Sequence, residues 1–347
     1  MANASYGGYA GYWLTVTPLN HPRDGCGTSS DDLSSDWEAE ETREVQKPSA
    51  WKRVRNLVRC TPFIQTYKKQ KYPWVQLAGH QGNFRAGHQG TILKKYSATE
   101  VACLEAIMKD ILRPFVPEYR GKVVQDDETY VELDDLLANF ENPCIMDIKV
   151  GVRTYSEEEL ARAKENPKLR KDMYEKMVQM DENEPTEEEH RLKAVTKPRY
   201  MVWRETISST ANLGFRIEGI KKSDGTTSKD FKSTKTKEQV MTAIREFTDG
   251  FPLALNSYYL RLQSIYNTLE KSEFFSNHEL IGSSLLFVHD KMNANIWMID
   301  FAKTVPVPPH LHITHRDPWK VGNHEDGYLI GVLNLLNIFK SLVEKCS

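Results

Sequence analysis

The chain has 347 residues, of which 39% are hydrophobic and 27% are charged, and its formal net charge is −2. This composition is ordinary for a soluble globular protein, and it excludes a largely disordered chain and a strongly basic nucleic-acid-binding protein. The length exceeds that of one usual domain, so we expect two lobes with a tail or an insert.

The cysteines and the apolar runs indicate a cellular compartment. Five cysteines are widely spaced and form no Cys-x-x-Cys pair, which argues against a disulfide framework and against a zinc site. No apolar run approaches the roughly 20 residues of a spanning helix, and the first residues lack the order of a secretory signal. We therefore expect a cytoplasmic protein with no integral membrane association and no nucleic-acid partner.

The first part of the chain divides into two segments. Residues 1–48 mix Gly, Ser, Asp, Thr and Pro without a sustained period, which predicts a disordered tail. Residues 49–73 are basic and aromatic. The start of this segment carries four cations, and its apolar residues lie on one face of a predicted helix: Trp51, Val54, Leu57 and Val58. This pattern is typical of calmodulin-binding segments, although Pro62 interrupts the helix and the same residues could pack on the first lobe.

Residues 74–140 predict a sheet-rich first lobe. Alternating and β-branched runs predict strands, and a recurrence of Val101, Leu104 and Ile107 predicts a helix. The expected elements are strands at Trp74–Ala78 and Thr91–Lys95, a helix at Ala98–Leu112, and a hairpin of Lys122–Val124 with Thr129–Leu133.

Residues 141–347 predict a second lobe that contains an insert. After an apolar strand at Cys144–Met146, residues 156–210 are charged and helix-prone, and three prolines divide them into short helices. The expected elements that follow are a strand at Gly214–Ile220, helices at Lys237–Phe247 and Leu253–Glu270, a hairpin of Ser284–Val288 with Asn295–Ile299, and a last helix at Asp326–Glu344.

Two carboxylates stand at the ends of apolar strands. Asp147 and Lys149 lie two residues apart, so their side chains point to the same side of a strand, and Asp300 ends a second apolar run. Phosphoryl transfer suits such a pair, because a lysine can neutralise the transferred phosphate while a carboxylate holds the attacking hydroxyl. The spacing alone is weak, since charged pairs at strand ends are usually solvated.

The run Pro143–Gly151 resembles the Pro-x-x-x-Asp-x-Lys-x-Gly signature of the inositol polyphosphate kinase family. The resemblance extends from about Trp51 to Leu342, and stretches such as Gly151–Tyr155 and Gly214–Lys222 are similar to the inositol 1,4,5-trisphosphate 3-kinase branch. It implies an α+β, two-lobed kinase-like fold of the protein-kinase or ATP-grasp type. It also implies that the insert is an all-helical inositol-phosphate-binding lobe.

The resemblance implies an ATP site between the lobes. Asp300 is expected to hold Mg²⁺ against the β- and γ-phosphates, and Lys94 to contact the α- and β-phosphates. The implied ATP-binding residues are Asn83, Lys94, Asp134, Asp135, Leu136, Asp147, Ser284 and Asp300. Ala302 stands where the family usually has glycine, and it would be strained if the backbone there needs a positive φ.

The resemblance also implies a basin of cations for the polyanionic substrate, because Arg and Lys form charge-assisted bonds with phosphate. The implied substrate-binding residues are Lys149, Arg170, Lys197, Tyr200, Arg204, Lys222 and Lys303. Without the resemblance, such cations on short helices would be interpreted as solvated.

The activity that the resemblance implies is ATP-dependent phosphorylation of the 3-hydroxyl of inositol 1,4,5-trisphosphate, with Asp147 and Lys149 catalytic and with calmodulin regulation. Whether Asp147 accepts the proton or only orients the hydroxyl stays open. Two alternatives remain: a broader inositol polyphosphate multikinase, disfavoured by the large insert, and a catalytically impaired scaffold, suggested by Ala302. A protein kinase is disfavoured because no His-Arg-Asp catalytic loop is present.

Overall fold

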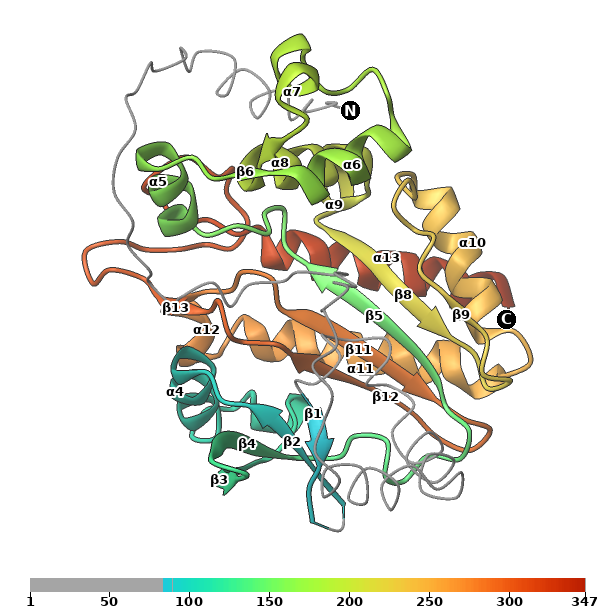
Figure 1. Ribbon diagram of the computed structural model, residues 1–347. Coiled ribbons are helices and arrows are strands. Elements are labelled where there is room, and N and C mark those ends of the chain that lie inside the picture. The colour runs from blue at the N-terminus through green and yellow to red at the C-terminus, as the bar shows by residue number, and fades with distance from the viewer. Residues whose placement is uncertain (1–83, 89, 347) are drawn as a thin grey trace, which may run out of the picture.

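The computed structural model describes residues 84–88 and 90–346. The predicted tail, the predicted calmodulin-binding segment, the strand expected at Trp74–Ala78 and the expected nucleotide ligand Asn83 lie outside the described residues. Figure 1 shows a small sheet at one end, a larger sheet in the middle and a group of helices at the other end.

The N-terminal lobe is an antiparallel sheet of four strands in the order β1-β2-β4-β3. Its strands are β1 (Phe84–Ala86), β2 (Thr91–Lys95), β3 (Tyr119–Gln125) and β4 (Glu128–Asp134). Helix α4 (Ala98–Ile107) and the short 3₁₀ helix η2 (Arg113–Phe115) lie between β2 and β3 in the chain. The predicted strand at Thr91–Lys95 and the predicted hairpin are confirmed. The predicted helix ends at Ile107 rather than Leu112, because a turn leads directly into η2.

The second lobe is built on an antiparallel five-stranded sheet in the order β12-β11-β5-β8-β9. Its strands are β5 (Cys144–Val150), β8 (Phe215–Lys221), β9 (Thr227–Ser228), β11 (Ser284–His289) and β12 (Ala294–Ile299). Helices α11 (Pro252–Leu269) and α13 (Tyr328–Cys346) pack against this sheet, and α10 (Lys237–Thr248) packs on those two helices. Their apolar side chains form one core with the sheet.

The insert between β5 and β8 is helical, as predicted. It contains α5 (Glu157–Glu165), α6 (Lys171–Met180), α7 (Glu187–Leu192), α8 (Lys197–Ile207) and α9 (Thr210–Leu213), with the short pair β6 (Leu169–Arg170) and β7 (Val195–Thr196). Met173, Met177, Val195 and Trp203 form a small core of its own. Capping boxes begin α5 and α7, which explains why these short helices start where they do.

Three short elements complete the described chain: α12 (Glu273–Ser276), β10 (His278–Glu279) and β13 (Val305–Pro306), of which the two strands pair with each other. The α+β fold class is confirmed: the described residues form a four-stranded sheet, a five-stranded sheet, two two-stranded sheets and a helical insert. Across the part of the chain that the structure describes, no helix is both long and apolar enough to span a bilayer.

Helix α13 approaches the central sheet closely at Gly331. A Cβ atom at Gly331 would lie 2.1 Å from the carbonyl oxygen of Gly214 and 2.9 Å from Val150 Cγ1. A Gly→Ala change in a helix usually stabilises by about 1 kcal/mol, but here we expect Gly331→Ala to lower the free energy of unfolding by about 1–3 kcal/mol through overpacking. Urea denaturation measures this change, and a variant as stable as the wild type would contradict it.

Candidate active site

A pocket lies between the two lobes. The N-terminal lobe contributes Phe84, Ile92, Lys94, Glu100, Leu104, Pro117, Leu133, Asp134, Leu136 and Leu137, and the second lobe contributes Leu286, Ile299, Asp300 and Phe301. The pocket is therefore apolar along most of its wall. Its charged groups are Asp134 and the cluster of Lys94, Glu100 and Asp300. This is the arrangement expected of a site that holds a flat apolar group and a charged one.

Lys94 joins the two lobes at this pocket. Lys94 Nζ donates to Glu100 Oε1 at 2.6 Å and to Asp300 Oδ1 at 2.7 Å. Burial alone would lower the pKa of Lys94, but Asp300 and Glu100 outweigh it and raise the pKa. The lysine is therefore held as a cation between two carboxylates.

Glu100 is a site residue that the sequence analysis missed. It lies in the first turn of α4, is 3% exposed, and also accepts a hydrogen bond from the backbone N–H of Phe301 at 3.1 Å. A signal was available, because Glu100 falls on the same helical stripe as Leu104 and Ile107, where a charge is not expected without a partner.

Asp300 follows β12 and has a left-handed backbone with φ of 66°. Burial would raise the pKa of its carboxyl, but Lys94 and then Lys149 lower it, so Asp300 is an anion. Ala302 does not have a positive φ. The strain considered at Ala302 is therefore not needed, because Asp300 adopts the left-handed conformation two residues earlier.

Asp147 lies on β5 and is 6% exposed. In the antiparallel register it faces Leu286 of β11, while Lys149 faces Ser284, so Asp147, Lys149, Leu286 and Ser284 share one face of the sheet. Leu286 lines the interlobe pocket, which places this face toward it. The predicted orientation of Asp147 and Lys149 to one side is confirmed.

The Asp147 carboxylate is poorly solvated. Asp147 Oδ1 and the neighbouring Ser284 Oγ have no hydrogen-bond partner among the described residues. Burial raises the pKa of Asp147 to about 7, with further increases from Glu218 and Asp300 and a decrease from Lys149. Its protonation therefore changes near neutral pH, which is unusual for an aspartate and typical of functional carboxylates.

Lys149 also lies near a partly buried carboxylate, Glu218. Lys149 Nζ lies 3.8 Å from Glu218 Oε1, and Arg216 binds the same oxygen at 2.9 Å through Nε. Burial would raise the pKa of Glu218, but Arg216, Lys149 and Arg204 lower it to about 2. Arg216 was not predicted, although a cation within the apolar strand Gly214–Ile220 is the same kind of signal as Asp147 in its own strand.

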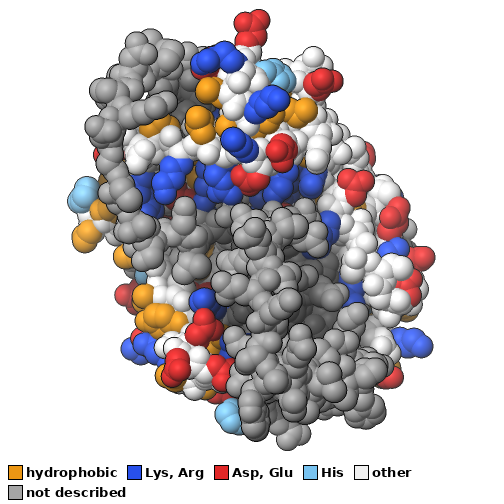
Figure 2. All heavy atoms as spheres, viewed as in Figure 1, with side chains coloured by type: hydrophobic (Ala, Val, Ile, Leu, Met, Phe, Trp, Pro, Cys, Tyr) orange, Lys and Arg blue, Asp and Glu red, His pale blue; other side chains and the backbone are white. Residues whose placement is uncertain are grey.

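Two predicted substrate ligands meet at Glu159 of α5. Lys197 Nζ donates to Glu159 Oε1 at 3.3 Å, and Lys303 Nζ lies 3.1 Å from both carboxylate oxygens. Burial lowers the pKa of Lys303, Glu159 opposes this effect, and Lys197 and Lys149 lower the pKa further. Figure 2 shows Lys and Arg side chains gathered in a band along the helical insert.

Three further predicted ligands extend this band. Arg170 binds Asp172 through Nε and through a terminal nitrogen, both at 2.9 Å. Burial raises the pKa of Tyr200, Arg204 and Arg216 oppose this effect, and Asp172 adds to it. Arg204 donates to the carbonyl of Lys232 at 3.1 Å, and burial together with Arg216 lowers its pKa.

The structure does not bring Lys222 to this band. Lys222 is exposed and follows the last residue of β8, Lys221, which pairs with Ile145 of β5. Ile145 is four residues from Lys149 along β5, so Lys221 is roughly 14 Å from Lys149 in the strand direction, and Lys222 lies beyond it. Lys221, rather than Lys222, shares the face of Asp147. The expected role of Lys222 therefore needs correction, because a shift of one residue changes the face of a strand.

The expected adenine and ribose contacts separate in the structure. Asp134 and Leu136 line the interlobe pocket, but Asp135 is not part of its wall. The Asp135 carboxylate accepts from the backbone N–H of Leu137 at 3.0 Å, and its own N–H donates to the Gly90 carbonyl at 2.9 Å. These two contacts hold Asp135 in the connection between the lobes, and its expected contact with nucleotide stays a prediction.

The carboxylates fit a magnesium ion that is shared with phosphate. No group of three or more His, Cys, Asp or Glu side chains that could hold a metal occurs within the described ranges. Mg²⁺ needs fewer, since it is usually bound by one or two carboxylates together with substrate phosphates and water. Asp300 and the unpartnered Oδ1 of Asp147 provide hard oxygen ligands of this kind.

Comparisons with known proteins identify a family for this chain. A family model described as "Inositol polyphosphate kinase" matches residues 130–340. The chain is 55% identical over 326 residues to inositol-trisphosphate 3-kinase B of Homo sapiens, covering 90% of this chain and 34% of that protein. It is 53% identical over 327 residues to the human 3-kinase A, covering 91% of this chain and 70% of that protein.

One solved structure is similar at lower identity. The inositol phosphate multikinase Ipk2 of S. cerevisiae, in complex with ADP and Mn²⁺, superposes with a TM-score of 0.49 at 21% identity, covering 73% of this chain and 99% of that chain. Of the two human relatives, the chain spans about a third of the length of 3-kinase B and 70% of the length of 3-kinase A.

Proposed function

This chain belongs to the inositol polyphosphate kinase family, and we propose that it transfers the γ-phosphate of ATP to the 3-hydroxyl of inositol 1,4,5-trisphosphate. The product would be inositol 1,3,4,5-tetrakisphosphate. One observation supports the proposal: Asp300 lines the apolar interlobe pocket beside Lys94, Asp147 and Lys149 share the sheet face of the pocket residue Leu286, and Lys149 acts electrostatically on Lys303 in the band of cations.

In this proposal the nucleotide lies in the interlobe pocket. Leu136, Leu286 and Ile299 would contact the adenine, and Lys94 would bind the α- and β-phosphates from its position between Glu100 and Asp300. Mg²⁺, when bound by Asp300 and Asp147 Oδ1, would neutralise charge that develops on the β- and γ-phosphates.

The substrate lies on the other side of Asp147. Lys149, Lys197, Lys303, Arg204 and Arg216 would form charge-assisted bonds to its phosphates, with Arg170 and Tyr200 at the edge of the site. Asp147 would hold the 3-hydroxyl in line with the γ-phosphorus, and Lys149 would contact the transferred phosphate. A bond then forms between the hydroxyl oxygen and phosphorus, the bond to ADP breaks, and the hydroxyl proton leaves to Asp147 or to solvent.

A product assay tests the function. The purified chain is incubated with Mg-ATP and a panel of inositol phosphates, and the position of each new phosphate is identified by NMR. We expect phosphorylation of inositol 1,4,5-trisphosphate at the 3-position and little turnover of the other isomers. Turnover of several isomers would indicate a multikinase, and no turnover would indicate a scaffold.

We propose that residues 74–140 form the nucleotide-binding N-lobe and residues 141–347 the C-lobe, with the insert 156–210 as the substrate lobe. The gap between the end of β4 at Asp134 and the start of β5 at Cys144 supports this division. Cys103 and Cys144 are free and buried, which supports a reducing, cytoplasmic location.

We also propose regulation by Ca²⁺ and calmodulin, from the sequence pattern of residues 49–73 alone. Because a bulky aromatic residue anchors such helices, Trp51→Ala should weaken calmodulin binding at least tenfold in calorimetry with Ca²⁺, and EGTA should abolish binding. Val124→Ala, which trims an exposed apolar side chain of the N-lobe, is the control and should bind normally. Equal affinity of the Trp51 variant and the wild type would contradict the proposal.

A further inference from the structure

A carboxylate lies within the band of cations that we assign to the substrate. Glu159 contacts Lys197 at 3.3 Å and Lys303 at 3.1 Å, and its side chain is 17% exposed. Burial would raise the pKa of Glu159, but Lys303 and Lys197 lower it, so the group is an anion. A site that binds only phosphates would gain nothing from a fixed negative charge at this place.

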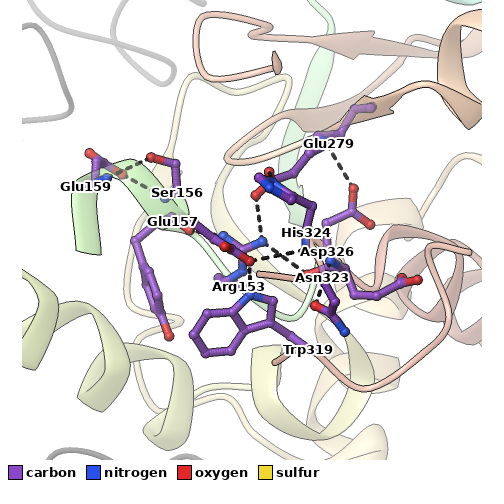
Figure 3. Close-up of polar contacts among 12 residues, drawn as sticks. Arg153, Ser156, Glu157, Glu159, Glu279, Trp319, Asn323, His324 and Asp326 are labelled. Atoms are coloured by element: carbon purple, nitrogen blue, oxygen red, sulfur yellow. Dashed lines mark hydrogen bonds and ion pairs between the residues drawn. The ribbon is translucent and has the colours of Figure 1, made fainter. Parts of the chain in front are cut away.

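The Glu159 side chain has a fixed position. Its Oε2 accepts a hydrogen bond from the backbone N–H of Ser156 at 3.0 Å, and Ser156 Oγ accepts from the N–H of Glu159 at 3.1 Å. This capping box, visible in Figure 3, begins helix α5. The carboxylate therefore cannot turn away from the lysines without losing the helix cap.

The start of α5 is itself attached to a distant loop. Glu157 Oε1 accepts from Trp319 Nε1 at 3.0 Å and from the N–H of His324 at 3.1 Å, and its Oε2 accepts from the N–H of Gly322 at 2.8 Å. Figure 3 shows Trp319 and His324 near Glu157. Three hydrogen bonds to one carboxylate make this attachment rigid.

The loop is held in turn by the segment that follows the catalytic strand β5. Arg153 is fully buried, lies 5.0 Å from the centre of the Trp319 ring, and donates to Glu279 Oε1 at 2.6 Å. His324 Nδ1 lies 2.6 Å from Glu279 Oε2. This network ties the start of α5, and with it Glu159, to the strand that carries Asp147 and Lys149.

We propose that Glu159 is a specificity-determining residue, whose fixed carboxylate accepts a hydrogen bond from a free ring hydroxyl and excludes an additional phosphate beside Lys197 and Lys303. This inference rests on the proposed function. A carboxylate accepts hydrogen bonds from hydroxyls and repels phosphate, so a cation site that contains one distinguishes the two groups at that position. In addition to the reacting 3-hydroxyl, inositol 1,4,5-trisphosphate has free hydroxyls at position 2, next to it on the ring, and at position 6, across the ring, and Glu159 would recognise one of these two.

Glu159→Gln tests the inference with the helix cap retained. Helix α10 already uses Gln239 at the same position of its capping box with Thr236, so glutamine satisfies the cap without the charge. The matched control is Glu158→Gln, which removes the same charge from the neighbouring exposed position. Glu159→Ala removes the charge and the cap together, and should shift selectivity in the same direction with lower stability.

The measurement compares kcat/KM for inositol 1,4,5-trisphosphate with kcat/KM for the two inositol tetrakisphosphates that carry one more phosphate, at position 2 or at position 6. For Glu159→Gln we expect the ratio for at least one of these isomers to rise tenfold or more, and for Glu158→Gln we expect no change. If Glu159 only orients the two lysines, all substrates will lose activity together and the ratio will stay constant, which would overturn the inference.

Calorimetry with the same three ligands and no nucleotide separates the inference from the proposed function. A wild-type chain that phosphorylates none of the ligands would refute the proposed activity. The selectivity of binding would still decide the role of Glu159, because a relative gain of tenfold or more for an isomer with the additional phosphate supports it. Unchanged relative affinities in the Glu159→Gln variant would overturn it.

Discussion

Replacing Asp300 by asparagine should reduce kcat by at least about a thousandfold, while inositol phosphate binding stays within about threefold of wild type. The substitution conserves shape but removes the anion that Lys94 contacts at 2.7 Å and the proposed ligand of Mg²⁺. Glu100 continues to hold Lys94 at 2.6 Å, so the pocket should keep its form. The predicted loss therefore lies in charge stabilisation during transfer and in nucleotide affinity.

The measurement combines ADP release with calorimetric titration of inositol 1,4,5-trisphosphate in the absence of nucleotide. Asp317→Asn serves as the control, because it removes one carboxylate from an exposed loop and should leave both quantities unchanged. Loss of inositol phosphate binding in the Asp300 variant would mean that Asp300 belongs to the substrate side. Retained turnover would mean that this carboxylate is dispensable.

The parts of the fold that could be predicted are those that depend on local patterns. The strand Thr91–Lys95 begins with two β-branched residues, and it forms as predicted. The helical insert could be predicted because prolines and capping residues mark helix ends within a few positions, as at Ser156 and Thr186. The side chains of Asp147 and Lys149 point to the same face of β5, which follows from the period of two residues in a strand.

The contacts that complete the site were beyond the sequence because they join distant segments. Lys94 and Asp300 are 206 positions apart, and the role of Glu100 depends on both. Arg216 is bound to Glu218 within one strand, but its relation to Lys149 appears only after β5 and β8 pair. Charges on apolar stripes indicated that partners exist without indicating which ones.

The correction concerns a single position at the end of an element. Lys222 was expected in the substrate site, but β8 ends at Lys221 and the next residue is exposed. The nucleotide contact expected of Asp135 stays a prediction, since its carboxylate binds the N–H of Leu137 in the turn. Element ends are the positions that sequence patterns determine least well, and one residue is enough to change the face of a strand.

The pKa of Asp147 predicts a pH dependence of turnover. Burial raises this pKa to about 7, and the proposed mechanism needs the carboxylate form. We therefore expect kcat/KM for Mg-ATP, which reports the chain before the metal binds Asp147, to fall about tenfold per pH unit below pH 7 and to level off above it. Asp147→Asn should lose at least about a thousandfold in kcat and abolish this titration. A rate independent of pH between 5.5 and 8 would contradict the assignment.

The same carboxylate should destabilise the folded chain at the pH where it works. An unfolded aspartate titrates near pH 4. Between about pH 4 and 7 the folded state therefore binds more protons than the unfolded state, and its stability falls as the pH rises. Above pH 7 both states are ionised and the penalty is constant. Asp147→Asn lacks this penalty, so we expect it to be more stable than wild type by about 2–4 kcal/mol at pH 8, and by little at pH 4.5.

Glu218 provides the opposite case on the neighbouring strand. Despite burial, Arg216 and Lys149 help to lower its pKa to about 2, so the stability that it contributes is present above the unfolded pKa and is lost as the pH falls toward 2. Glu218→Gln should therefore destabilise the chain at pH 8, where Asp147→Asn stabilises it. Urea unfolding of both variants at pH 4.5 and 8 measures these signs. A less stable Asp147→Asn at pH 8 would mean that Lys149 outweighs burial and that the carboxylate is not poised for catalysis.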